Sequence, residues 1–367
     1  IKLMKKLFII GNGLSAWCVA NAFVEKDVSI TLIGESKKTF GAQQLSPNGF
    51  NALQNLTENN NFKKSINEIV ELRINTYKNG KFKNLNKFYF NEYNLNYYSI
   101  SREVLLKLLI KNIKKKKKIN EIDSNCVGII DKNNNKLCVL LENNEKHLCD
   151  MVIGTDGVNG VSRKYVCGES NIVKKKYFRG ISKDTKEYLL LQKTLQLNFT
   201  KYGHVVSYPF INGKNKFLNY VFVPNINFQQ SNKTNENLNG IMEFALINWK
   251  EVSFSFFDEE IQSTFKKNVL LFGDAGYTFE PHLAQVGNQI IEDSFYLKCL
   301  LDKNDDYNEI FYKFSTKRFK KKRELQSISN LIGKSFGLKD CKYLRDIVYA
   351  NLSDKLIYNF FNKVWND

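Results

Sequence analysis

The sequence predicts an α/β protein with a parallel sheet assembled from separated segments, an inserted and mostly antiparallel sheet, and C-terminal helices. Three observations predict this class. Strand-like, glycine-turn, helix-like and strand-like stretches follow one another between Leu7 and Ile33, which is the βαβ pattern of a parallel sheet. Two further short apolar runs, Met151–Ile153 and Val269–Phe272, lead into turns that contain glycine and aspartate. Strands and turns dominate from residue 189 to 256, and helical periodicity dominates from Gln289 onward.

The composition limits the class of protein. A chain of 367 residues, 43% of them hydrophobic, can bury a large core, and no apolar run approaches the roughly 18 residues of a membrane span. The seven cysteines include no Cys-x-x-Cys pair, and the three histidines lie far apart in sequence, so no metal site is indicated. We therefore expect a cytoplasmic protein with reduced cysteines that act as small buried hydrophobes.

The formal net charge of +18 raises the question of nucleic-acid binding. Lys, Asn, Ile, Phe and Tyr are all over-used, however, which indicates a compositional bias spread over the whole chain. The densest basic runs, Lys114–Lys118 and Lys317–Arg323, fall on or beside predicted helices and are expected to be solvated faces. We expect no nucleic-acid partner.

The first motif is a glycine turn between a strand and a helix predicted over Leu14–Glu25. Gly11 permits a tight turn, Gly13 lets the backbone approach a pyrophosphate, and Ala16 is small enough for helix and strand to pack closely. The helix N-terminus supplies amide donors to the phosphate. Glu35 follows the second strand, where a carboxylate can accept hydrogen bonds from ribose hydroxyls. The pattern favours a Rossmann-like dinucleotide-binding domain over a plain tight turn.

Two later turns place acids at the same edge of the sheet. Asp156 follows the apolar run at Met151–Ile153, and Asp274 follows the run at Val269–Phe272. Ligands of parallel sheets collect at the carboxyl ends of the strands. The loop Pro281–Asn288 then leads into a helix, so its backbone N–H groups and the positive end of the helix dipole can face a ligand.

The segments between these motifs predict simpler elements. Residues 72–90 alternate around Lys78-Asn79-Gly80, a hairpin signal, and Ser101–Ile113 has the leucine spacing of a helix. The runs Val127–Ile130 and Leu137–Leu141 flank a polar turn and predict a second hairpin.

The motifs, in this order, resemble single-component FAD-dependent aromatic hydroxylases of the salicylate hydroxylase type, within the wider group that includes ubiquinone-biosynthesis hydroxylases. The resemblance covers nearly the whole chain. It also includes Gly41–Asn48, Ser101-Arg102, His204–Pro209 with Leu218–Val221, and Arg323–Ser329.

The resemblance implies positions for the FAD. The pyrophosphate would lie on Gly11, Gly13 and Ala16, and the adenosine ribose would lie at Glu35. NADH or NADPH would visit only transiently, because a single glycine fingerprint is present and such enzymes have no second dinucleotide fold.

Further cofactor contacts are implied along the chain. Gln44 and Arg102 would contact the FAD, the arginine at a phosphate, and Asp156 would support the site and the approach of the nicotinamide. Asp274 would bind the ribityl or pyrophosphate region. The isoalloxazine would be bordered by Pro281, Gly287 and Asn288.

The chain departs from the family pattern at several places. Tyr277 stands where many relatives have histidine, and Val286 stands where relatives have the glycine after the glutamine of the loop. Glu280 and His282 put ionisable groups on both sides of Pro281, close to the expected flavin ring.

The implied domain boundaries follow the motifs. The FAD-binding domain would comprise residues 4–70, 100–165 and 262–300, the substrate sheet domain residues 71–99 and 166–261, and the C-terminal helical region residues 301–367.

The implied reaction is hydroxylation of an aromatic substrate, phenolic or a quinone precursor. NAD(P)H would reduce the FAD, O₂ would add to give a flavin C4a-hydroperoxide, and its terminal oxygen would pass to the ring. His204, Tyr277 and His282 are the candidates for helping a phenol lose its proton. Each also has a structural interpretation, as a hydrogen-bonded histidine, a packed aromatic ring and a solvent-facing loop residue.

Two alternative functions remain open: a flavin-dependent halogenase or other flavin oxidoreductase, and a flavin-free basic protein. A flavin-dependent halogenase would fit Trp17 and Glu280-Pro281, but a Trp-x-Trp-x-Ile-Pro element is absent and Lys78 lies in a turn. A flavin-free basic protein would bind nucleic acid or an anionic membrane. Its membrane contact would use the final helix, where apolar residues between Leu356 and Trp365 share one face, although such a face usually packs onto its own domain.

Overall fold

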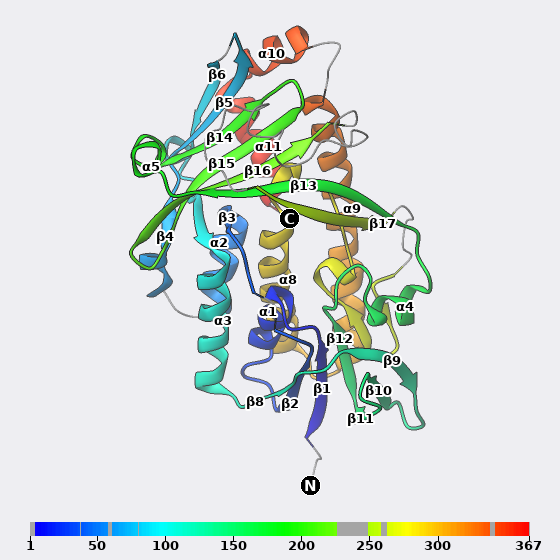
Figure 1. The fold of residues 1–367 in the computed structure, drawn as a ribbon. Coiled ribbons are helices and arrows are strands. Elements are labelled where there is room, and N and C mark those ends of the chain that lie inside the picture. Colours follow the sequence, from blue (N-terminus) through cyan, green and yellow to red (C-terminus); the bar gives the residue numbers. More distant parts are fainter. Residues whose placement is uncertain are drawn as a thin grey trace.

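The computed structural model describes residues 4–36, 38–57, 61–79, 81–225, 249–257, 263–337 and 342–366. A parallel sheet with its helices forms the lower half of Figure 1, and a large twisted sheet forms the upper half. The predicted fold class is confirmed.

The lower half is built on a six-stranded sheet of order β18-β19-β12-β1-β2-β8, in which all neighbours are parallel except β18 and β19. Its strands are Lys5–Ile10 (β1), Val28–Ile33 (β2), Ile119–Ile122 (β8), Met151–Gly154 (β12), Phe265–Lys266 (β18) and Val269–Leu271 (β19). Leu7 and Ile9 enter one apolar core while Phe8 and Ile10 enter another, so both faces of β1 are buried. This explains why its sequence is a continuous apolar run.

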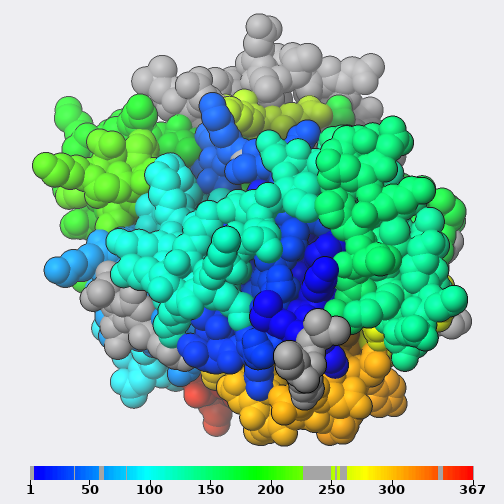
Figure 2. Space-filling view, turned by 90° about the horizontal axis from the view of Figure 1, so that it is seen from below, coloured from blue at the N-terminus to red at the C-terminus, as the bar shows by residue number. Residues whose placement is uncertain are grey.

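Helices cover one face of this sheet and a small sheet covers the other. The helices are Leu14–Ala22 (α1), Pro47–Thr57 (α2), Arg102–Lys116 (α3) and Val286–Lys303 (α8). On the other face lie Cys126–Asp131 (β9), Leu137–Leu141 (β10), Lys146–Cys149 (β11) and the short helix Val161–Cys167 (α4). Seen from below, the blue N-terminal segment is flanked by cyan, green and orange segments from much later in the chain (Figure 2).

The upper half is a seven-stranded sheet of order β17-β13-β16-β15-β14-β5-β6, antiparallel apart from the β14–β5 pair. Its strands are Glu71–Lys78 (β5), Lys81–Tyr89 (β6), Ile172–Ser182 (β13), Thr194–Phe199 (β14), Gly203–Asn212 (β15), Asn215–Pro224 (β16) and Lys250–Phe257 (β17). The β5–β6 hairpin confirms the one predicted around Lys78, which is exposed at the end of β5.

Helix bounds differ from prediction at several places, by three residues at the end of α3 and at the start of α8. α1 ends at Ala22, earlier than predicted. Residues Thr185–Leu191 form a helix (α5), although the strand-rich stretch was predicted to start at Leu189. The Asp184 side chain explains this helix, because its carboxylate accepts from the backbone N–H groups of Lys186 and Glu187.

A three-stranded sheet that was not predicted joins the two halves. It consists of Ala42–Leu45 (β3), Ile66–Glu68 (β4) and Tyr98–Ser101 (β7). The Ser99 hydroxyl donates to the Pro209 carbonyl on β15, and the Tyr208 hydroxyl donates to the Ala42 carbonyl at 3.0 Å. One-turn helices at Asn61–Ser65 (η1) and Phe90–Tyr93 (η2) flank it in the chain.

The last three helices are Tyr307–Phe336 (α9), Lys342–Ala350 (α10) and Asp354–Trp365 (α11). α9 runs along both halves (Figure 1). Phe311 and Phe314 near its start belong to the core of the parallel sheet, whereas Leu325 and Phe336 belong to the core under the large sheet. No described helix is both long and apolar enough to cross a bilayer.

The basic run Lys317–Arg323 on α9 is only partly the solvated face that was predicted. Arg318, Lys321 and Lys322 are buried, because this side of α9 packs against the rest of the protein. Arg318 and Lys322 form ion pairs with acidic residues of α8.

The final helix packs on its own protein. Trp365 is 6% exposed, and its ring stacks on Phe361 with centroids 4.5 Å apart. Phe361 in turn meets the ring of Phe88 on β6 at 5.7 Å. The apolar face predicted for this helix is thus used mainly inside the molecule, although Leu356 is 58% exposed.

We expect Trp365→Ala to lower the free energy of unfolding by about 2–4 kcal/mol, since a large buried ring is removed. Leu356→Ala on the exposed side of α11 is the control and should change it by less than about 0.5 kcal/mol. Urea unfolding of both variants measures the difference. Equal, small effects would show that α11 does not contribute to the core.

Candidate functional site

The glycine turn after β1 brings three strand ends together. Gly11 has φ +120°, and a Cβ there would lie 2.4 Å from Thr155 Oγ1, which follows β12. Gly34, after β2, has φ +149°, and a Cβ there would lie 3.2 Å from the backbone of Gly11. Side chains at these positions would hold the strand ends apart. The first glycine is therefore required by the fold itself.

Gly13 is different, because the fold alone does not require it. Its φ of −98° suits any residue, and a Cβ there would meet no atom within 4 Å. It forms the N-cap of α1, which has no side-chain cap, so N–H groups of the first turn face open space. Ala16 is fully buried in the packing of α1. An anion at this helix N-terminus would satisfy the free donors.

Two predicted acids near this turn have different surroundings. Glu35 is exposed and takes part in one long hydrogen bond, 3.5 Å from Asn125 Nδ2. Asp156 instead accepts from the Ser162 backbone N–H at 3.0 Å and from the Ser162 hydroxyl, at the start of α4. Burial raises the pKa of Asp156, against the effect of these hydrogen bonds. Its carboxylate is thus engaged within its own turn.

Asp274 and Arg102 come together from distant segments. Gly273, with φ +60°, turns the chain after β19, and Asp274 follows in a short 3-10 helix (Gly273–Ala275, η3). Arg102 begins α3 and acts electrostatically on Asp274. Asp274 is crowded by protein atoms, yet much of its own surface is accessible, and Arg102 is also only partly covered. This combination of close protein neighbours and accessible surface indicates side chains that line an internal space.

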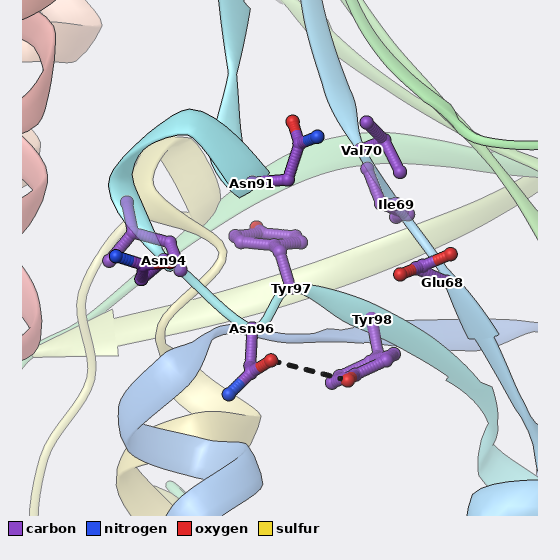
Figure 3. Close-up of a pocket in the computed structure, with 9 residues that line it drawn as sticks. Glu68, Ile69, Val70, Asn91, Asn94, Asn96, Tyr97 and Tyr98 are labelled. Atoms are coloured by element: carbon purple, nitrogen blue, oxygen red, sulfur yellow. Dashed lines mark hydrogen bonds between the residues drawn. The ribbon is translucent and has the colours of Figure 1, made fainter.

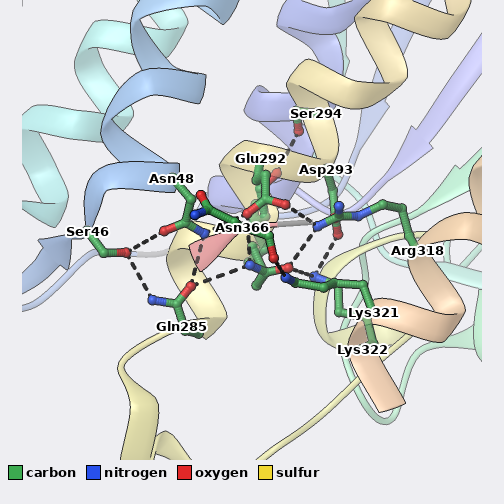
Figure 4. Close-up of polar contacts among 12 residues, drawn as sticks. Ser46, Asn48, Gln285, Glu292, Asp293, Ser294, Arg318, Lys321, Lys322 and Asn366 are labelled. Carbon is green, nitrogen blue, oxygen red and sulfur yellow. Dashed lines mark hydrogen bonds and ion pairs between the residues drawn. The ribbon is translucent and has the colours of Figure 1, made fainter. Parts of the chain in front are cut away.

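The loop before α8 is held by the segment that the resemblance had singled out. Residues Pro281–Leu283 form a 3-10 turn (η4), and α8 starts at Val286 without a side-chain cap. The Gln285 amide donates to Ser46 Oγ at 2.9 Å, and Asn48 donates to Gln285 Oε1 at 3.1 Å. The Ser46 N–H donates to Asn288 Oδ1 at 3.3 Å. Figure 4 shows this network continuing to Arg318 and Lys322.

Adjacent glutamines on β3 point to opposite sides. Gln44, the predicted contact, accepts a hydrogen bond from the Tyr97 hydroxyl and is buried. Gln43 instead lies against Gly287, and neither atom of its amide has a hydrogen-bond partner among the described residues. Gln43 is therefore the glutamine whose amide is available to a ligand. The sequence of a four-residue strand does not determine which of the two glutamines faces the site.

The three predicted catalytic side chains are separated into two places. His204 on β15 and His282 in η4 are neighbours, with ring centroids 5.4 Å apart. Burial, helped by His282 and Arg345, holds the pKa of His204 well below its usual value, so His204 is neutral. Tyr277 lies elsewhere, with its ring 5.9 Å from Phe319 of α9.

Glu280 organises the histidine side of the site. Its Oε2 is 2.9 Å from His282 Nε2 and accepts from the Tyr177 hydroxyl at 3.1 Å, and its Oε1 pairs with Lys175. Burial alone would raise the pKa of Glu280, but His282 and Lys175 lower it to about 2. His282 Nδ1 is buried and, among the described residues, has no hydrogen-bond partner. Lys175 and Tyr177 were not predicted, because no local motif marks a contact made across two halves of a molecule.

A groove of about 300 Å³ lies elsewhere on the molecule. Residues of β4, η2 and β7 and their connections line it, with Asn96 and Tyr98 hydrogen-bonded at 3.4 Å (Figure 3). None of the predicted site residues lines it, so its location gives no support for a catalytic role.

No family model matches this sequence, and a search of the curated proteins gave no match. Solved structures do match it. Klebsiella pneumoniae HpxO, complexed with FAD and uric acid, is 15% identical with a TM-score of 0.80, covering 98% of this chain and 96% of HpxO. This chain has the fold of that flavoprotein.

Other matches agree with this assignment of the fold. A substrate complex of salicylate hydroxylase is 16% identical with a TM-score of 0.79, covering 100% of this chain and 96% of the enzyme. The 2,6-dihydroxypyridine-3-hydroxylase of Arthrobacter nicotinovorans is 14% identical with a TM-score of 0.73, covering 91% and 93%. The fold implied by the sequence resemblance is thereby confirmed along the whole chain.

We expect Glu280→Gln to lower the free energy of unfolding by about 1–3 kcal/mol at pH 7, because His282, Lys175 and Tyr177 lose the carboxylate that they contact. The folded pKa of about 2 lies below the ordinary 4.5, so the carboxylate stabilises the protein above pH 4.5. The cost of the substitution should shrink as the pH falls from 4.5 towards 2.

Glu145→Gln is the matched control, because Glu145 also pairs with a histidine, His147 at 2.8 Å, but its side chain is 55% exposed. Its cost should stay below about 0.5 kcal/mol at every pH. Urea titrations at several pH values make the comparison. A Glu280→Gln cost that does not depend on pH would contradict the electrostatic account.

Proposed function

We propose that this protein is an FAD-dependent monooxygenase that uses NAD(P)H and O₂ to hydroxylate a small aromatic substrate. The observation that carries the proposal is that two helix N-termini next to the predicted site residues, that of α1 at Gly13 and that of α8 at Gln285, have no side-chain cap. The matched structures add support, since HpxO is complexed with FAD and uric acid and the others are named as hydroxylases of aromatic compounds.

The residues present fit FAD. The open space at Gly13 and the free N–H groups of α1 suit the pyrophosphate, with Glu35 placed for the adenosine ribose. Arg102 and Asp274 line the internal space between the strand ends, where they would contact the phosphate and ribityl regions. Pro281, Gly287 and Gln43 would border the flavin ring.

When bound, FAD supplies the transfer of electrons from NAD(P)H and the activation of O₂. The protein supplies position and environment. The start of α8 places N–H groups and the positive end of the helix dipole beside the expected ring, which favours negative charge there. The large sheet covers this region and excludes water.

His282 is the better candidate for accepting a phenolic proton. Glu280 orients its imidazole through Nε2 at 2.9 Å and stabilises the charge that a proton would bring, while the buried Nδ1 is available to a substrate hydroxyl. His204 is held neutral by burial and is suited to accepting a hydrogen bond rather than a full proton. Asp156 and Gln44 would support the cofactor site indirectly, because Asp156 holds the turn between β12 and α4 and Gln44 holds strand β3. A cytoplasmic setting and the domain boundaries stay predictions.

The direct test is to purify the protein, measure bound flavin, and follow NAD(P)H oxidation with a panel of phenols. Hydroxylated product equal to the NAD(P)H consumed supports the proposal. A protein that stays colourless after incubation with FAD contradicts it.

We expect Gly13→Glu to weaken FAD binding by at least about 100-fold, because the side chain would fill the phosphate position and repel it. The variant should still fold, since a Cβ at Gly13 meets no protein atom within 4 Å and its φ of −98° suits any residue. Flavin absorbance of the purified variant and its urea unfolding measure the two effects.

Gly11→Ala is the contrasting control. Its methyl group would collide with Thr155 in a backbone conformation that alanine avoids, so stability should fall. Full retention of flavin by folded Gly13→Glu would remove the pyrophosphate assignment.

A further inference from the structure

The last turns of α9 contact the loop that holds Glu280 and His282. The Ser329 hydroxyl, which is buried, donates to the Glu280 carbonyl at 2.7 Å. The ring of Phe336 meets the His282 ring edge to face, with centroids 6.1 Å apart. Gly333 lies between these two helix residues, one turn after Ser329. One face of the helix therefore contacts both ionisable residues of the loop.

The helix itself does not require a glycine at position 333. Gly333 lies inside α9 and is not among the glycines with a positive φ. Alanine is more favourable than glycine in a helix interior, because glycine loses more backbone freedom on folding. The reason for this glycine therefore has to be a contact outside the helix.

The imidazole of His282 makes that contact. A Cβ at Gly333 would lie 2.3 Å from His282 Nε2 and 2.5 Å from its Cδ2, which is too close for any side chain. This edge of the ring is also the one that pairs with Glu280, since Nε2 is 2.9 Å from Glu280 Oε2. The His282 side chain is only 6% exposed, so the ring has little room to move. A methyl group at position 333 would push the ring away from the carboxylate.

The position of this edge also determines the position of the opposite one. An imidazole is a rigid plane, so a shift of Nε2 also moves Nδ1, the buried nitrogen that has no partner among the described residues. With Nε2 donating to Glu280, Nδ1 carries the lone pair that can accept a proton. His204 borders the ring on another side, with centroids 5.4 Å apart. Contacts around the ring thus define where Nδ1 lies.

We propose that Gly333 is the positioning residue for His282, because its lack of a side chain lets the imidazole lie against α9 with Nδ1 placed for a phenolic hydroxyl. The inference rests on the proposed function, in which His282 accepts that proton. In this step the phenolic O–H bond breaks, the proton joins Nδ1, and the electron pair stays on the phenolic oxygen. The Glu280 carboxylate stabilises the imidazolium that forms.

The experiment compares Gly333→Ala with Gly337→Ala in the FAD-bound protein. Gly337 follows the last turn of the same helix with φ −84°, and a Cβ there would meet only backbone atoms, at 3.4 Å or more. The control therefore makes the same substitution without a collision. The probe is 4-nitrophenol, whose phenolate absorbs visible light. Its proton loss on binding is read from a difference spectrum, without turnover, at a pH where the free phenol is protonated.

The wild type and Gly337→Ala should bind part of the probe as phenolate. Gly333→Ala should lower the phenolate fraction of the bound probe at least about tenfold, and kcat for a phenol that is turned over by roughly 100-fold, the cost of a misplacement of about 1 Å. KM should change by less than about threefold, because contacts to the rest of the substrate are kept. Equal phenolate fractions in the wild type and Gly333→Ala, or no phenolate in the wild type, overturn the inference.

Substitution of His282 tests the contact itself. In a His282→Ala background the collision is absent, so Gly333→Ala should raise the melting temperature, as alanine does in a helix. With His282 present, Gly333→Ala should lower the melting temperature. If Gly333→Ala alone does not fold, restored folding of the double variant gives the same answer. A lower melting temperature in both backgrounds would assign the glycine to another contact and overturn the positioning role.

Failure of the proposed function has a different readout. A wild type that hydroxylates phenols, together with a Gly333→Ala variant that ionises the probe normally, refutes this inference and leaves the monooxygenase standing. If the protein never binds FAD, the probe is added to the flavin-free protein. Ionisation by the wild type that is lost in Gly333→Ala would then retain the positioning role without the monooxygenase. Absence of that difference would remove both.

Discussion

The site depends on a buried ion network that joins helices α8 and α9. Arg318 Nε is 2.5 Å from Asp293 Oδ1, its Nη2 is 2.8 Å from Glu292 Oε1, and Lys322 Nζ is 2.9 Å from Asp293 Oδ2. Charges this deeply buried are tolerated only when every partner is in place, so the network admits one relative position of the two helices. Because α8 begins at the loop that would border the flavin, that position also fixes the floor of the site. The hydrogen bonds from Asn48 to Glu292 and Gln285 attach the start of α2, directly after β3, to helix α8 of this network.

Some positively charged groups around the site are paired with acids of the protein, and others are not. The excess of basic residues is not confined to the surface, since the chain brings Lys175, Arg318 and Lys322 to acids that no sequence motif connects with them. Where the acid is supplied by the protein, as at Glu280 and Asp293, the result is a fixed geometry. Where it is not, as at the N-terminus of α1, the uncapped N–H donors suit an external anion. The difference separates supporting residues from binding residues.

Local signals in the sequence were sufficient for the glycine turn, the two glycine–aspartate turns and the loop before α8. Each of these depends on backbone freedom or on a helix N-terminus, which a few adjacent residues determine. Side-chain partners were a different matter. The choice between Gln43 and Gln44 depends on the phase of a four-residue strand, and the capping role of Asp156 depends on Ser162 six residues later. Which side of Lys317–Arg323 is buried depends on the acids of α8. The role of Lys175 depends on its ion pair with Glu280, which forms only because β13 packs against the loop that holds Glu280. Such pairings are properties of the packed molecule.

The topology of the parallel sheet has a consequence for biosynthesis. β1 is translated long before β12, its neighbour in the sheet, and β12 obtains its other parallel partner only with β19 at Val269–Leu271. Until then the nascent chain carries an open, apolar sheet edge, which is prone to pairing with other chains. The large sheet is translated during this interval and can assemble ahead of the domain that encloses it in the sequence. The half with the parallel sheet is thus begun before the large sheet and completed after it, and shortened chains that end before β19 would expose that edge permanently.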